Sequence, residues 1–142
     1  MHLEYAFIAD AADARDGLFY VLRGGTDIWN IQADTPLPWV VGPMSFVVRL
    51  VGETREIGLL KQVGFKIVDA DSRPIGLEGS AQIEFGPHPV DRTRTSGALI
   101  HFRVPTASVP GPGAYFFEVH SDDQRLCQVP FWVMSVDATS LG

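Results

Sequence analysis

Two pairs of carboxylates are the residues whose types and spacing come nearest to a metal site. Asp69 and Asp71 lie in one polar stretch, and Asp122 and Asp123 lie in another. Calcium takes about six to eight oxygen ligands from flexible loops, so these four carboxylates would suit it if both stretches met at one end of the fold. Aspartate is also common in turns, because its side chain accepts backbone hydrogen bonds. We take turns as the leading interpretation and calcium as the alternative.

Histidine and cysteine supply the other reactive groups. His88, His101 and His120 are imidazole ligands in principle, but two outward histidines on neighbouring strands do not complete a zinc site. Cys127 and His120 would face each other across a hairpin, as a nucleophile and a base. A catalytic thiol needs a lowered pKa and an oxyanion hole, and no motif indicates either. We therefore expect no enzyme and no cofactor, and a small hydrolase ranks third among the candidate functions.

An apolar surface is the remaining candidate for a site. Trp132 lies between Phe131 and Val133, so if these two face the core, Trp132 faces outward. Together with Met134 and Phe116 on the opposite strand, it would form an exposed apolar patch, and such patches mark interfaces. The alternative is a second layer that covers this face. The interface candidates are Phe116, Trp132 and Met134.

These residues belong to a predicted β-hairpin near the end of the chain. Tyr115, Phe117 and Val119 alternate with more polar residues, residues 121–124 form a polar turn, and residues 126–133 return as the second strand. One hairpin buries too little apolar surface to be stable alone. The rest of the chain must therefore supply sheets that cover it.

Short strands separated by turn signals account for most of the remaining sequence. We expect a strand covered on both faces at 3–9 and an edge strand near 39–43. Two connections are expected, a polar one at 10–17 and a long one at 86–97. Further strands are expected at 18–23, 27–32, 44–51, 59–69, 75–77, 81–85 and 98–104. Val47 is apolar on the outward face of its strand, so that face should be partly covered. The pattern predicts an all-β, antiparallel β-sandwich of about seven to nine strands, with a small β-barrel as the alternative.

Composition limits the partners and the compartment. The chain has 142 residues, which suits one domain over 1–136 with a flexible tail at 137–142. A net charge of −6 argues against nucleic acid and against anionic membranes. The single cysteine allows no internal disulfide, and the longest apolar stretch, 37–48, is interrupted by prolines. We expect a cytoplasmic protein.

Several glycines, prolines and aromatics also carry a resemblance. The chain resembles a family of uncharacterised small bacterial proteins in residues 6–11, Gly17, Leu22, Gly24, Gly25, Pro36, Pro38 and 113–117. The resemblance implies a single-domain sandwich related to immunoglobulin or C2 domains, and it carries no catalytic signature.

The sequence thus favours a non-enzymatic binding or assembly module. It would meet protein partners or its own copies, as a homo-oligomer, through an outer sheet face or an edge strand. The second hypothesis is a calcium- or small-ligand-binding sandwich that uses the end loops at 69–73 and 121–124.

Overall fold

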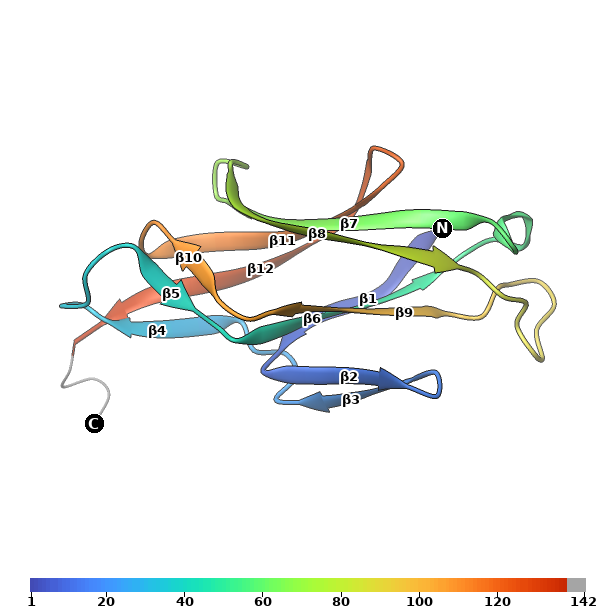
Figure 1. The fold of residues 1–142 in the computed structure, drawn as a ribbon, viewed down its shortest axis with the longest axis horizontal. Coiled ribbons are helices and arrows are strands. Elements are labelled where there is room, and N and C mark those ends of the chain that lie inside the picture. The colour runs from blue at the N-terminus through green and yellow to red at the C-terminus, as the bar shows by residue number, and fades with distance from the viewer. Residues whose placement is uncertain (138–142) are drawn as a thin grey trace.

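The predicted hairpin lies at the centre of a five-stranded sheet. In the computed structural model, which describes residues 1–137, β11 (Gly113–Ser121) pairs with β12 (Gln124–Val136) in antiparallel register. The turn between them has positive φ at Asp122 and Asp123, as a two-residue hairpin turn requires. The sheet is completed by β4 (Ile28–Gln32), β7 (Leu60–Asp69) and β8 (Pro74–Glu84), in the order β4-β12-β11-β7-β8 (Figure 1). The hairpin prediction is confirmed.

A second, smaller sheet packs against the first. It contains β1 (His2–Ala9), β6 (Met44–Val51) and β9 (Ala98–Val104), with β6 in the middle. A separate short pair is formed by β5 (Trp39–Val41), which precedes β6, and β10 (Ala107–Val109), which follows β9. A single 3-10 turn, η1 (Thr54–Glu56), follows β6. The all-β sandwich predicted from the sequence is confirmed.

Aromatic side chains fill the space between the two sheets. Phe46 of β6 stacks on Phe117 of β11 with 4.4 Å between ring centroids, and Phe65 of β7 lies 4.3 Å from Phe102 of β9. Tyr115, Phe117 and Val119 are all buried, as their alternation predicts. Each strand therefore turns its more apolar side toward the opposite sheet.

A third layer covers the outer face of the smaller sheet. The hairpin of β2 (Ala11–Arg15) and β3 (Leu18–Leu22) packs against β6 and β9 and lies below them in Figure 1. Val47 is fully buried, so the expectation that its face is covered is confirmed. The connection predicted at 10–17 is wrong, because β2 fills most of it and Asp16 and Gly17 form its turn with positive φ. One side of this hairpin faces solvent. β2 therefore lacks the regularly spaced apolar residues that mark a buried strand in a sequence.

Other sequence expectations need correction. Only Ile8 and Ala9 of β1 are buried, because β1 is an edge strand and is not covered on both faces. The strands predicted at 75–77 and 81–85 belong to one strand, β8, which continues through residues 78–80 and ends at Glu84. The sandwich is also not purely antiparallel, since β4 runs parallel to β12.

Two further expectations concern the C-terminal tail and the membrane. The predicted tail lies outside the described residues except for Asp137. Over residues 1–137, none of the helical structure is long and apolar enough to cross a bilayer.

Gly52 offers a test of how tightly the core is packed. A Cβ at this position would lie 2.7 Å from Cδ2 of Phe85, whose side chain is fully buried and has no room to withdraw. We expect Gly52→Ala to lower the free energy of unfolding by about 1–3 kcal/mol, measured by urea denaturation.

Gly64→Ala is the matched control for this substitution. Its Cβ would meet only the carbonyl oxygen of Gly79 at 3.5 Å, which is ordinary contact, so its stability should stay within about 1 kcal/mol of the wild type. Equal stabilities for the two variants would contradict the packing described here.

Candidate functional site

The outer face of the five-stranded sheet carries a contiguous group of exposed apolar side chains. Trp132 pairs across to Ala114 on one side and to Ile28 on the other, and Phe116 pairs with Pro130. Exposed fractions are 40% for Trp132, 47% for Met134 and 48% for Ile28. We call Ile28, Phe116, Pro130, Trp132 and Met134 the apolar patch.

The direction of Trp132 follows from its two neighbours. Phe131 and Val133 are buried, and the Phe131 ring lies 5.6 Å from Tyr115 and 5.5 Å from Phe117. Because side chains alternate along a strand, Trp132 must point away from these aromatic rings. The prediction of an outward Trp132 is confirmed. Over residues 1–137 no second layer covers this face, since Trp132 stays 40% exposed and the extra β2–β3 layer lies over the smaller sheet.

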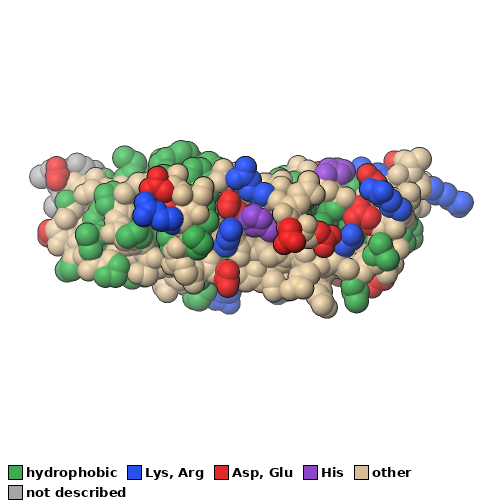
Figure 2. Space-filling model, turned by 90° about the horizontal axis from the view of Figure 1, so that it is seen from above, with side chains coloured by type: hydrophobic (Ala, Val, Ile, Leu, Met, Phe, Trp, Pro, Cys, Tyr) green, Lys and Arg blue, Asp and Glu red, His purple; other side chains and the backbone are tan. Residues whose placement is uncertain are grey.

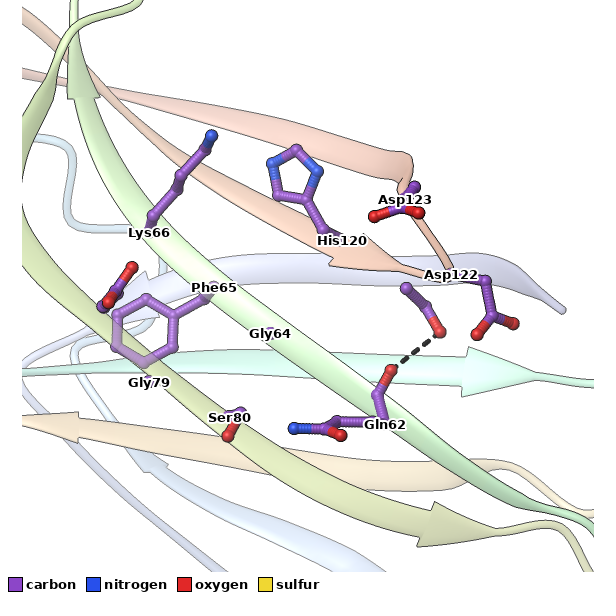
Figure 3. Close-up of a pocket in the computed structure, with 11 residues that line it drawn as sticks. Gln62, Gly64, Phe65, Lys66, Gly79, Ser80, His120, Asp122 and Asp123 are labelled. Carbon is purple, nitrogen blue, oxygen red and sulfur yellow. Dashed lines mark hydrogen bonds between the residues drawn. The ribbon is translucent and has the colours of Figure 1, made fainter.

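A polar groove occupies the other half of the same face. It has a volume of about 800 Å³ and is lined mainly by Gln62, Gly64, Lys66, Glu78, Ser80 and His120. Gly64 has no side chain, which leaves room on this face of the sheet. The side chains of Lys66 and His120 project in the same direction (Figure 3). In the view from above, hydrophobic side chains gather toward the left, where one group of acidic and basic side chains lies among them (Figure 2). Histidine and further charged side chains lie toward the middle and right.

Glu118 lies between these two halves. It follows Phe116 and precedes His120 on the outward side of β11, and its carboxylate is nearly fully buried. Its Oε1 lies 3.6 Å from Nε2 of His120, and its Oε2 lies 3.6 Å from Nη1 of Arg125. The buried charge therefore has the Arg125 guanidinium as its counterion, as burial of a carboxylate requires.

The groove offers little for covalent chemistry. A carboxylate beside an imidazole can orient the ring, but a nucleophile must also lie within reach. The Ser121 hydroxyl at the groove's edge already donates to the Gln62 carbonyl oxygen at 2.8 Å, shown dashed in Figure 3.

The two acidic pairs do not meet. Asp69 pairs with Tyr115 at one end of the β7–β11 ladder, while Asp122 and Asp123 follow β11 at the other end. The condition for the alternative, a calcium site built from both pairs, is therefore not fulfilled. Over residues 1–137, no group of three or more His, Cys, Asp or Glu side chains could hold a metal ion.

The first acidic pair instead stabilises a turn. The Asp69 carboxylate accepts hydrogen bonds from the backbone N–H groups of Asp71 and Arg73, both at 2.9 Å. Arg73 also donates to Asp71 at 2.7 Å, and this hydrogen bond raises the pKa of the guanidinium. These carboxylates have the ordinary turn role that the sequence favoured.

The histidines are also separated. His101 lies on β9 in the smaller sheet, and His120 lies on β11 in the larger one. His88 lies in the loop before β9, where its Nδ1 accepts hydrogen bonds from the N–H groups of Val90 and Asp91. The strands of His101 and His120 are therefore not neighbours, and the three histidines do not come together.

Cys127 and His120 lie on opposite faces of the sheet. Cys127 pairs with the buried Val119, and cross-strand partners share a face, so its thiol points toward the core. His120 pairs with Arg125 on the outer face. Burial raises the pKa of the Cys127 thiol from 9.0 to about 11. The two residues weighed as a nucleophile and a base therefore do not face each other.

Two features of this region were missed by sequence reasoning. Ile28 extends the apolar patch, and its exposure follows from the parallel pairing of β4 with β12, which no local pattern reveals. The groove combines residues of β7, β8 and β11 around Gly64. Its only sequence signal was the alternation of Gln62, Gly64 and Lys66, which marks one polar side of a strand.

The thiol gives a direct test of the assignment of Cys127 to the core. Because its pKa in the folded state is raised, we expect native protein at pH 8 to react with iodoacetamide at least about 100-fold more slowly than protein unfolded in urea. Mass spectrometry of quenched samples measures both rates. Labelling of the native protein as fast as that of the unfolded protein would contradict the assignment.

The model of a family of unknown function, DUF6941, matches residues 4–134. No curated protein matches the chain.

Proposed function

We propose that this chain, which belongs to the DUF6941 family, is a non-enzymatic binding module that holds a protein partner on its apolar patch. The observation that carries the proposal is the exposure of Trp132 beside Met134 and Ile28, on a sheet face that residues 1–137 leave open to solvent. Large apolar side chains that gather on a surface and remain open to solvent usually mark an interface.

The surroundings of the patch support this proposal. Protein interfaces have an apolar centre, a polar rim, and a tryptophan or tyrosine among the few residues that dominate affinity. Here Trp132 lies between Ile28 and Ala114, and the ion-paired Glu118 and Arg125 border the patch on the groove side. The compensated charges of Glu118 and Arg125 can stay at the rim without leaving an unpaired charge when a partner docks.

The chemistry of the partner follows from the composition of this surface. A net charge of −6 disfavours nucleic acid and anionic lipid, whereas the patch suits an apolar side chain presented by a protein. The only cysteine, Cys127, is free, which supports a reducing compartment such as the cytoplasm. The immunoglobulin- or C2-like character of the sandwich is part of the same proposal.

Photo-crosslinking from the patch tests this function in the cell from which the chain comes. We expect benzoylphenylalanine in place of Trp132 to give one discrete protein adduct on irradiation, because the partner covers this ring. The same probe in place of Gln82, an exposed residue of β8 on the same sheet, is the matched control and should give none. The absence of an adduct at position 132 would contradict the proposal.

The identified partner then allows an affinity measurement. We expect Trp132→Ala to weaken binding by roughly 30-fold in isothermal titration calorimetry, as for a central interface residue. Gln82→Ala should leave the dissociation constant unchanged. Because Trp132 is substantially exposed, Trp132→Ala should keep the melting temperature close to that of the wild type. Equal affinities for wild type and Trp132→Ala would rule out the patch as the binding surface.

A further inference from the structure

The β2–β3 hairpin exposes a second apolar surface, on the opposite layer from the patch. Leu18, Tyr20 and Leu22 alternate along β3 and are exposed by 61%, 56% and 67%. The intervening Phe19 points toward the body of the protein, where its ring lies 6.4 Å from that of Tyr5. Figure 1 places β3 at the lower margin of the molecule, farther from the sheets than β2.

One edge of β3 is also open. Among the described residues β3 pairs only with β2, in the register that joins Arg15 to Leu18 and Asp13 to Tyr20. A two-residue turn closes on a hydrogen-bonded pair, and hydrogen bonding then alternates along the strand. The backbone groups of Leu18, Tyr20 and Leu22 therefore face β2, while those of Phe19 and Val21 face the open edge.

We infer that this edge binds the same edge of a second copy, in antiparallel register with Tyr20 opposite Tyr20. The strand reads nearly the same in both directions, Leu-Phe-Tyr-Val-Leu, so this register places Leu18 of each copy opposite Leu22 of the other. It also places Phe19 opposite Val21, and these are the residues whose backbone groups are open. Two copies of β2–β3 then form one continuous four-stranded sheet.

The charges at the ends of β3 suit this register. Position 23 of one copy lies opposite position 17 of the other, which puts Arg23 next to the Asp16–Gly17 turn of its partner. Arg23 is an exposed side chain whose present partner is Asp10, at 3.2 Å. Arg23 can therefore reach the partner's Asp16 at both ends of the interface, and attraction there offsets part of the repulsion between two chains of net charge −6.

Self-pairing also explains the composition of the edge. Exposed apolar edge strands are avoided in monomers because they invite further strands, and a charge or a proline usually interrupts them. β3 carries neither between Leu18 and Leu22. Because a five-residue ladder is shorter than a standard interface, we expect a dissociation constant on the order of 10 µM.

Sedimentation velocity across about 1–500 µM full-length protein tests the inference. Wild type should pass from monomer to dimer over this range. Tyr20→Lys and Tyr20→Glu should each remain monomeric, because like charges meet at the two-fold axis. An equimolar mixture of the two variants should form a heterodimer, because lysine then faces glutamate. A monomeric wild type, a dimeric Tyr20→Lys protein or a monomeric mixture would overturn the inference.

Leu60→Lys is the matched control, because Leu60 is as exposed as Leu22, at 69%, and lies on β7. It should dimerise like the wild type. The melting temperatures of the Tyr20 variants should match that of the wild type, because the Tyr20 side chain is exposed. Trp132→Ala should dimerise as well, since the inferred interface does not include the apolar patch. Loss of the dimer in Trp132→Ala but not in Tyr20→Lys would overturn this inference and leave the patch as the contact surface.

Discussion

The contact between Phe46 and Phe117 is the constraint on which the remaining structure depends. It joins the central strand of each sheet, and Phe117 is in turn within 5.9 Å of Phe65 and 5.5 Å of Phe131. Side chains along a strand alternate between faces, so fixing one inward ring fixes the direction of every neighbour. The outward directions of Phe116 and Trp132 are therefore consequences of core packing. A shift of one residue in either strand would move the core rings into solvent.

The same constraint separates the reactive groups of the chain. Val119 is two residues from Phe117 and faces inward, so its partner Cys127 faces inward as well. His120 then falls on the opposite side of the sheet. The antiparallel direction of β7 and β11 likewise places Asp69 and the Asp122–Asp123 turn at opposite ends. What remains on the outer face is the apolar patch and the polar groove, with Glu118 and its ion pair to Arg125 between them.

The sequence predicted the strands whose two faces differ clearly in polarity. The β11–β12 hairpin, β7 and β9 alternate apolar and polar residues, and Trp132 was placed correctly by the same alternation. The prediction failed for β2, because Asp13 and Arg15 lie in a hairpin that has one face in solvent. The prediction also divided β8 into two strands at its glycines. The parallel pairing of β4 and the groove at Gly64 depend on register between distant strands, for which local patterns carry no information.

The layering explains why apolar surface remains on both sides of the molecule. Strands that face water on one side normally carry polar residues there, yet β12 carries Trp132 and Met134, and β3 carries Leu18, Tyr20 and Leu22. These residues add nothing to the core, and their exposure favours association. Because one surface lies on the larger sheet and the other on the outermost hairpin, both can be occupied at once. A dimer joined through β3 would present two apolar patches, and a partner with two binding segments would gain affinity through avidity.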